Sequence, residues 1–145
     1  MTLIGIRGDA GFVNPKLLLY AVQNSPCLVI DCANAANPHA IFPLYPDEAA
    51  LCRVQVIQVE LIYTFRDVLK QLYETGDFQN TKKIVITTFH HLFNYGNEKE
   101  NREIYRHAWE LMAKLGETCE VLVGVAKPHE EQAKKYCEVL ETSTS

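Results

Sequence analysis

Hydrophobic and polar positions along the chain follow two alternating patterns. Short apolar runs, whose length and β-branched content predict strands, alternate with longer stretches in which apolar residues recur every three or four positions. The predicted strands are 2–7, 27–32, 54–59, 84–87 and 120–126. The run 84–87 has the composition of a central strand buried on both faces. The run 54–59 alternates in part, which favours a position near an edge of the sheet.

The longer stretches predict helices between these strands. Apolar residues at helical spacing in 62–73 and 104–115 indicate two amphipathic helices, which Gly76 and Gly116 are expected to end. The pair Asn14-Pro15 predicts a helix over 15–23, because asparagine is a good N-cap and proline suits the first helical position.

Two further helices complete the pattern. Asp47 is expected to cap a short helix through Leu51, and Pro128 is expected to start a final helix that reaches Leu140. The segment 33–46 holds three prolines and predicts a long surface loop.

Strands that alternate with helices predict right-handed crossovers and a mostly parallel sheet of about five strands. The chain has 145 residues, of which 48% are hydrophobic, so it is long enough for one domain and short for two. We therefore expect a three-layer α/β/α sandwich over residues 1–141, followed by a disordered tail at 142–145.

Composition indicates the cellular compartment and the chemical state of the cysteines. No apolar run approaches the roughly 20 residues of a membrane span, and the start lacks the pattern of a signal peptide, so we expect a cytoplasmic protein. The cysteines are odd in number and form no CxxC pair, which favours buried thiols over a disulfide framework or a zinc knuckle. They are Cys27, Cys32, Cys52, Cys119 and Cys137.

The formal net charge of −4 argues against a nonspecific nucleic-acid-binding protein. The basic candidates are the pair Lys82-Lys83 and the set Lys99, Arg102 and Arg106, and both are interpreted as solvated faces. If nucleic acid is a partner, the second set is where it would bind.

Polar side chains follow two of the predicted buried strands. Asp31, His90 and His91 stand at strand ends that are expected to meet at one edge of the sheet, where α/β proteins bind ligands. A hydrolytic or metal site built from Asp31, His90 and Cys32 is one hypothesis. The alternative is that Asp31 caps a turn and Cys32 is a buried thiol.

A metal site needs three or four ligands, and the other histidines, which are His39, His107 and His129, show no ligand spacing. We therefore expect no metal, no cofactor and no catalytic residue. Trp109 is interpreted as a core residue rather than an interface residue, and Tyr63, Phe65 and Tyr73 are interpreted in the same way.

The segment from Gly8 to Lys16 joins the first strand to the first helix. A strand, a glycine-containing loop and a helix are the parts of a phosphate cradle. The candidate ligand-binding residues are therefore Gly8, Gly11, Asn14 and Lys16 from this segment, with Asp31 and His90.

The order of elements resembles the core of RecA/RadA-like ATPases, a class of P-loop proteins. The resemblance rests on the glycine segment, on Ile30-Asp31-Cys32-Ala33 and on Ile84-Val85-Ile86-Thr87-Thr88, and it implies a RecA-like fold. Active members have a GxxxxGK motif followed by Ser or Thr, in which backbone N–H groups and lysine hold the phosphates. Counted from Gly8, this chain places Val13, Asn14 and Pro15 at the glycine, lysine and hydroxyl positions.

Two further features of the class are missing. The acid that organises magnesium is replaced by Thr87 or Thr88, and the glutamate that activates water is replaced by Ala33. The resemblance therefore implies a degenerate phosphate loop and a non-catalytic protein-interaction or scaffold subunit, with a protein partner or a second copy of the chain. A link to DNA repair or recombination follows from the resemblance alone. The alternative is a small-ligand or nucleotide-binding protein, or a hydrolase, that uses the sheet edge near Asp31 and His90.

Overall fold

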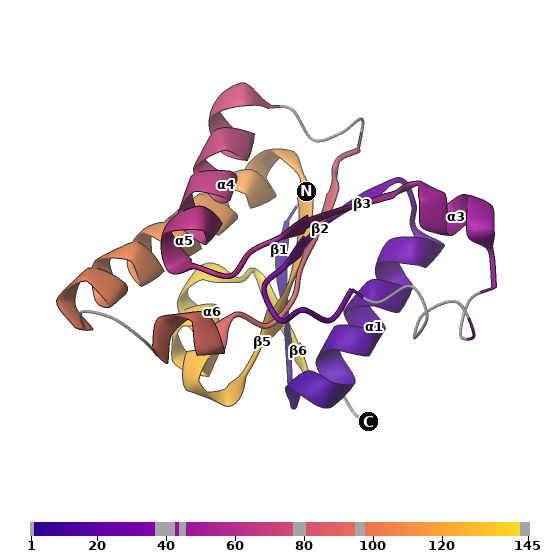
Figure 1. The fold of residues 1–145 in the computed structure, drawn as a ribbon. Coiled ribbons are helices and arrows are strands. Elements are labelled where there is room, and N and C mark those ends of the chain that lie inside the picture. Colours follow the sequence, from indigo (N-terminus) through magenta and orange to yellow (C-terminus); the bar gives the residue numbers. More distant parts are fainter. Residues whose placement is uncertain (1, 37–42, 44–45, 77–80, 95–97, 143–145) are drawn as a thin grey trace.

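Six parallel strands form the centre of the computed structural model, which describes residues 2–36, 43, 46–76, 81–94 and 98–142 (Figure 1). Their order in the sheet is β3-β2-β4-β5-β1-β6, and every neighbouring pair is parallel. The predicted parallel sheet is confirmed, with β4 in the interior and β3 at an edge. The strands are β1 (Leu3–Arg7), β2 (Cys27–Asp31), β3 (Val54–Gln58), β4 (Lys83–Ile86), β5 (Glu120–Val125) and β6 (Val139–Thr142).

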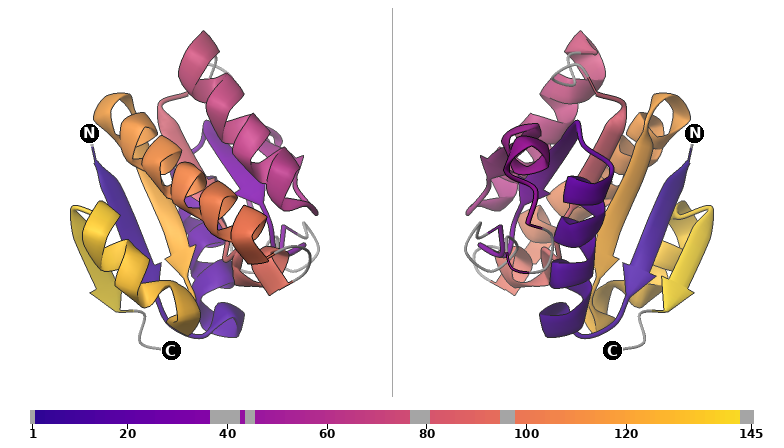
Figure 2. Two further views of the ribbon diagram at one scale, coloured as in Figure 1. Left: turned by 90° about the vertical axis from the view of Figure 1, so that its left-hand side faces the viewer. Right: turned by 90° about the vertical axis from the view of Figure 1, so that its right-hand side faces the viewer.

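Helices cover both faces of the sheet (Figure 2). One face carries α1 (Ala10–Gln23) and α3 (Glu48–Cys52), and the other carries α4 (Ile62–Thr75), α5 (Glu98–Thr118) and α6 (Glu130–Tyr136). Two short 3₁₀ helices, η1 (His90–Asn94) and η2 (Lys127–His129), follow β4 and β5. The three-layer architecture is confirmed. Within the described residues, no helix is long and apolar enough to span a membrane.

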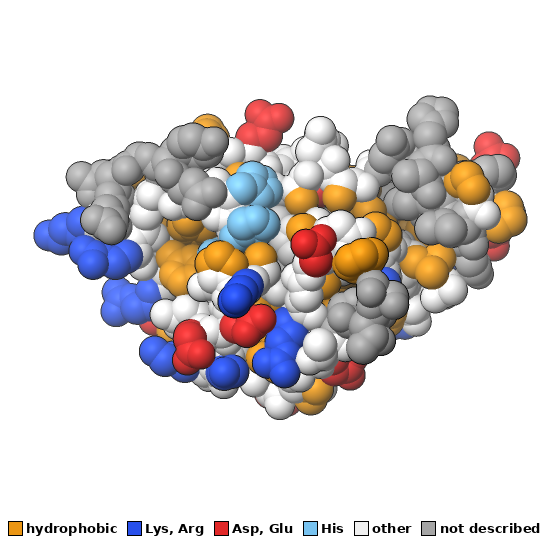
Figure 3. Space-filling view, turned by 90° about the horizontal axis from the view of Figure 1, so that it is seen from below, with side chains coloured by type: hydrophobic (Ala, Val, Ile, Leu, Met, Phe, Trp, Pro, Cys, Tyr) orange, Lys and Arg blue, Asp and Glu red, His pale blue; other side chains and the backbone are white. Residues whose placement is uncertain are grey.

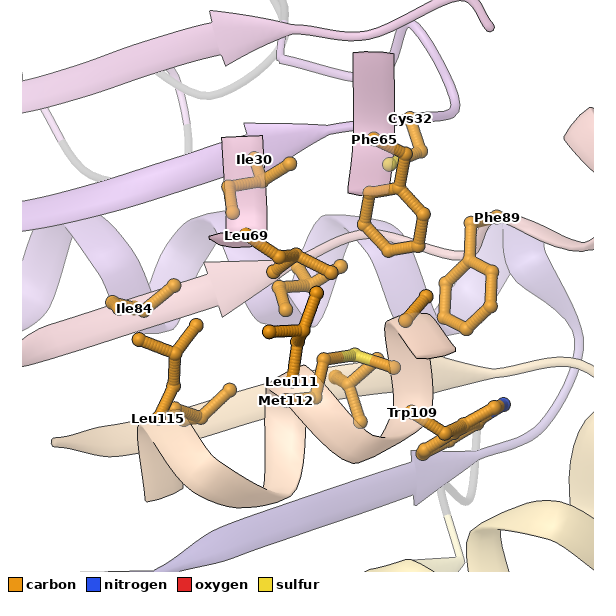
Figure 4. Close-up of a cluster of buried hydrophobic side chains, with 14 of the residues drawn as sticks. Ile30, Cys32, Phe65, Leu69, Ile84, Phe89, Trp109, Leu111, Met112 and Leu115 are labelled. Atoms are coloured by element: carbon orange, nitrogen blue, oxygen red, sulfur yellow. The ribbon is translucent and has the colours of Figure 1, made fainter. Parts of the chain in front are cut away.

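The larger of two core clusters lies between the sheet and the layer of α4, α5 and α6 (Figure 4). Phe65 and Trp109 are fully buried there, as predicted, and Phe89 packs between them. The core assignment is wrong for Tyr63 and Tyr73, whose exposed fractions are 44% and 45%. Both lie on the solvent side of α4. They flank its apolar stripe, and helical spacing alone does not decide whether such flanking residues are buried.

The end of the chain differs from the prediction. The final helix ends at Tyr136 instead of Leu140, and Val139–Thr142 pairs with β1 as a sixth strand. This strand completes the hydrogen bonding of β1, but its four residues are too few to show an alternating pattern. Thr142, expected to be disordered, pairs with Arg7 and accepts a hydrogen bond from its Nε at 2.7 Å. The remainder of the predicted tail, 143–145, lies outside the described residues.

Glycine ends only one of the two amphipathic helices. Helix α4 stops at Gly76, which has a left-handed φ of 67°, but α5 continues through Gly116 to Thr118. A Cβ at Gly116 would lie 3.0 Å from the backbone nitrogen of Leu3. Gly116 therefore serves the close approach of α5 to β1 and not a helix end.

The cysteines in the structure are free thiols. Cys27, Cys32 and Cys119 are buried and Cys137 is half-buried, as expected for thiols in apolar surroundings. Cys52 is exposed at the end of α3, which corrects the prediction for that residue.

Candidate functional site

The carboxyl ends of the strands form the face of the molecule shown in Figure 3, where histidine side chains gather beside apolar residues. An open cavity of about 560 Å³ lies at this edge and brings together three predicted site residues, Gly11, Asn14 and His90. Gly8, Lys16 and Asp31 do not line it. Its other lining residues are Ala10, Pro15, Ala33, Ala35, Thr88 and His91.

The segment predicted as a glycine loop is mostly helix. Helix α1 begins at Ala10, so only Gly8 and Asp9 connect it to β1. Asp9 is the N-cap: its Oδ1 accepts a hydrogen bond from the Gly11 N–H at 2.8 Å, and its carbonyl accepts from Phe12 and Val13. The predicted start at Pro15 is therefore wrong. Pro15 lies inside α1, near its beginning, and is exposed.

The Asp9 carboxylate changes the chemistry of this helix end. A helix N-terminus attracts anions because its first N–H groups are unpaired and its dipole is positive there. Here the protein supplies its own anion, which bonds to the Gly11 N–H. A phosphate at the same end would meet a carboxylate instead of free N–H groups.

Asn14 is a buried residue of α1 and not an N-cap. Its Nδ2 donates to the Thr88 hydroxyl at 2.9 Å, and its Oδ1 accepts from the Thr88 N–H at 3.0 Å. This reciprocal pair ties α1 to the segment after β4. Both polar ends of the amide are therefore used inside the protein.

Asp31 organises the turn after β2, in agreement with the turn-capping alternative. It is 1% exposed. Its Oδ1 accepts from the N–H groups of Ala33 and Ala35, and its Oδ2 accepts from Ala36 at 2.9 Å. The Thr87 hydroxyl also lies 3.3 Å from Oδ1. The carboxylate is thus surrounded by the protein's own donors.

The hypothesis of a metal or nucleophile beside Asp31 gains no support. Burial, with a further contribution from Asp31, raises the pKa of the Cys32 thiol well above its usual value, so the thiol stays protonated. The described residues contain no group of three His, Cys, Asp or Glu side chains that could hold a metal ion. His39 lies outside the described residues.

His90 is half-buried at the start of η1. Its Nδ1 is buried and has no hydrogen-bond partner among the described residues. Its ring lies 5.5 Å from that of His91 and 6.3 Å from that of His129. Burial, and to a lesser extent His91, lowers the pKa of His90, so its ring is neutral at pH 7.

A second cavity, of about 410 Å³, lies between η1, α5 and the segment of η2 and α6. The sequence does not predict this cavity. Arg102 and Tyr105 follow each other at helical spacing on α5, but His129 and the other residues that complete the wall with them come from other elements of the chain. The lining residues are His90, Phe93, Asn101, Arg102, Tyr105, Pro128, His129, Glu131 and Gln132.

Aromatic rings pack around His129, which lines this second cavity. The His129 ring lies 4.7 Å from that of Tyr105 and 4.9 Å from that of Phe89. Burial, with a contribution from His90, lowers the pKa of His129 to about 4, and burial raises the pKa of Tyr105 to about 12. At neutral pH the histidine is therefore uncharged and the phenol is protonated.

The predicted basic set lies along one stripe of α5, because Arg102 and Arg106 follow Lys99 by three and seven positions. All three side chains are exposed, and Arg106 Nε lies 4.0 Å from Glu110 Oε1. Acidic residues interrupt the stripe, as a solvated face requires. A nucleic-acid partner stays a prediction.

The two lysines of the pair Lys82-Lys83 differ in exposure. Lys82 is exposed, but Lys83 is half-buried, and its Nζ lies 3.4 Å from Asn24 Oδ1.

No protein-family model matches the sequence, and no curated protein matches it. Among solved structures, the crystal structure of the RadB recombinase is similar, with a TM-score of 0.69 and 13% sequence identity. The matched region covers 96% of this chain and 72% of that chain. At this identity the likeness concerns the fold alone. The chain therefore has an α/β fold that matches that of the RecA-like RadB recombinase.

Proposed function

We propose that this chain is a RecA-like protein with a degenerate phosphate loop that acts as a non-catalytic protein-interaction or scaffold subunit. A role connected with DNA repair or recombination is part of the proposal, and its support is the similarity of fold to the RadB recombinase. Fold alone is a weak guide to function. The other parts of the proposal rest on the local geometry of the site and of the sheet edge.

The connection between β1 and α1 is the observation that carries the proposal. A phosphate loop wraps its ligand with the backbone N–H groups of several consecutive residues. Here Gly8 and Asp9 alone join the two elements, and the Asp9 carboxylate is bonded at the helix start. Lys16 lies in the second turn of α1 and does not line the cavity at this edge.

The magnesium and water-activating positions support the same conclusion. Thr87 and Thr88 follow β4, and a hydroxyl cannot supply the charge of an acid. The Thr87 hydroxyl accepts from the N–H groups of Cys32 and Ala33, and the Thr88 hydroxyl accepts from Asn14. Ala33 has no group that could activate water. These side chains act within the structure instead of on a nucleotide.

Among the described residues no strand pairs with the outer edge of β3, and this edge supports a role in protein interaction. An edge strand offers unpaired backbone groups to another chain, and charges or proline usually block it. The β3 sequence Val-Gln-Val-Ile-Gln contains neither. Val56 on this strand is 43% exposed, and Leu61 just after the strand is 64% exposed.

The alternative, a small-ligand or nucleotide-binding protein or a hydrolase at the same sheet edge, is favoured by one observation, the open cavity beside Asn14 and His90. Its weakness is that Asp31 does not line this cavity and that both ends of the Asn14 amide are already bonded.

Thermal unfolding with Mg-ATP, Mg-GTP and their diphosphates tests the proposal. A ligand that binds only the folded state raises the unfolding midpoint, and at 100 times its Kd it adds about 2.7 kcal/mol. We expect no rise at millimolar nucleotide, while a P-loop ATPase measured alongside shows one.

A clear rise would contradict the proposal and favour the alternative. The variants Lys16→Ala and His90→Ala then locate the nucleotide: loss of the rise in the first assigns phosphate binding to α1, and loss in the second assigns binding to the cavity.

A further inference from the structure

Three buried polar atoms that form no hydrogen bond of ordinary geometry among the described residues belong to one cluster of rings, although Trp109 interacts with the Tyr105 hydroxyl closely enough to lower the pKa of Tyr105 against the effect of burial. They are His90 Nδ1, Tyr105 Oη and Trp109 Nε1. The Tyr105 ring lies 6.4 Å from that of Trp109 and 4.7 Å from that of His129, which in turn lies 6.3 Å from that of His90. Buried polar atoms in folded proteins nearly always have a partner. Two of the residues concerned, His90 and Tyr105, line a neighbouring cavity, whereas Trp109 lies behind Tyr105 in the core.

Ring-bearing residues form part of the wall of the cavity beside these atoms, and polar residues of α5 and α6 form the rest. His90 and Tyr105 line it, and so do the rings of Phe93, His129 and Pro128. Its volume of about 410 Å³ is within the range of small-molecule sites. Aromatic walls favour a planar ligand, because rings gain most by stacking or by edge-to-face contact.

Charge at the cavity favours an anion. Arg102 is an exposed lining residue, and no ion pair of its guanidinium occurs among the described residues. The lining acid is Glu131, whose side chain is 86% exposed and lies 3.4 Å from Lys134 Nζ. His90 and His129 are neutral at pH 7 because burial lowers the pKa of each. Arg102 is therefore the lining residue that offers a positive charge to a ligand, and the charge of the lining acid is offset by Lys134.

We propose that this cavity binds a planar organic carboxylate, with the carboxylate on Arg102 and the ring of the ligand against Phe93 and His129. One guanidinium matches the two oxygens of a carboxylate in a bidentate geometry. A phosphate would favour more than one cation. The inference does not depend on the loss of nucleotide chemistry, because no residue of α1 lines this cavity.

Benzoate is the probe, and Trp109 is the reporter. Trp109 is the only tryptophan in the chain, so the protein gives a single indole N–H signal in a ¹⁵N NMR spectrum. We expect benzoate to shift this signal saturably with a Kd of about 1 mM or tighter. Benzamide, the neutral analogue, should not give a saturable shift of this signal. Arg102→Gln should weaken benzoate binding about tenfold, because it removes a charge-assisted pair.

Arg106→Gln is the matched control, since Arg106 is an exposed arginine one turn further along α5 and does not line the cavity. It should bind benzoate like the wild type. Far-UV circular dichroism of each variant verifies that the fold is intact.

Three results would overturn the inference. The first is the absence of a saturable shift up to about 20 mM benzoate. The second is an equal response to benzamide, or equal affinity in Arg102→Gln and the wild type. The third is tighter binding of phenyl phosphate than of benzoate, which would exclude a carboxylate as the preferred anion.

Discussion

At the scale of single residues, the polar side chains that follow the strands mostly hold the fold together. Asp31 bonds to the turn after β2, and Asn14 bonds to Thr88 across the gap between α1 and β4. These are the residue types that also bind ligands, which is why the sequence predicts a site. Their partners, which decide between the two roles, come from distant parts of the chain.

The Asn14 and Thr88 pair gives a prediction for stability. Asn14→Ala should lower the free energy of unfolding by about 2 kcal/mol, because it leaves the buried Thr88 N–H without its acceptor. Thr88→Val should cost about 1 kcal/mol, since it removes the acceptor of the Asn14 amide. Urea denaturation of both single variants and the double variant measures the coupling.

We expect a coupling of about 1 kcal/mol, because the two side chains contact each other directly. Gln23→Ala removes an exposed amide from the same helix and should change stability by less than about 0.5 kcal/mol. Additive effects of the two substitutions would contradict the reciprocal hydrogen bonds.

His129 gives a prediction for pH. Its pKa is about 4 in the folded protein, against 6.5 without burial, so the unfolded chain takes up a proton first as the pH falls. The contribution of His129 to stability is therefore fully present above pH 6.5 and is lost as the pH falls towards 4. The linked change is about 3 kcal/mol.

The free energy of unfolding, measured by urea denaturation between pH 7 and pH 4, should fall less steeply in His129→Gln than in the wild type. His107→Gln, which changes a histidine of α5 outside the ring cluster, should keep the wild-type slope. A wild-type slope in His129→Gln would show that the buried imidazole is not the source.

At the scale of elements, the two edges of the sheet differ. Strand β6 carries Glu141, whose charge opposes pairing with another chain, whereas β3 carries no charged residue or proline. Two β3 strands related by a twofold axis could join two sheets into one, with the same surface used by both copies. The edge of β3 is therefore where we expect self-association.

A matched pair of valines tests this edge. Val56 on β3 and Val139 on β6 are 43% and 44% exposed. The wild type should show a molar mass above the 16.5 kDa of one chain in size-exclusion chromatography with light scattering. Val56→Lys should return the mass to that of one chain, and Val139→Lys should not, because only the first places a charge on β3.

The self-association hypothesis fails if the wild type has the mass of one chain at every concentration tested. It also fails if Val139→Lys disrupts the assembly as strongly as Val56→Lys does.

At the scale of the whole molecule, the parallel sheet brings the ends of β1, β2 and β4 to one face and leaves a cavity on each side of it. The first cavity adjoins α1, the second adjoins α5 and α6, and His90 lines both. The second cavity is lined by residues of α5 and α6, two helices that are separated in the chain by β5. Nothing in the local sequence of either helix identifies it.

The sequence by itself determined the layers, the parallel strands and the interior position of β4, because each depends on the local spacing of apolar residues that must be buried. Through the resemblance to RecA/RadA-like ATPases, it also predicts a degenerate phosphate loop, which stays a prediction. Only the tertiary structure decided that Asn14 bonds to Thr88, that Gly116 lies inside a helix and that 139–142 form a sixth strand. Those outcomes depend on contacts with Thr88, Leu3 and β1, which lie far away in sequence and leave no periodic signal.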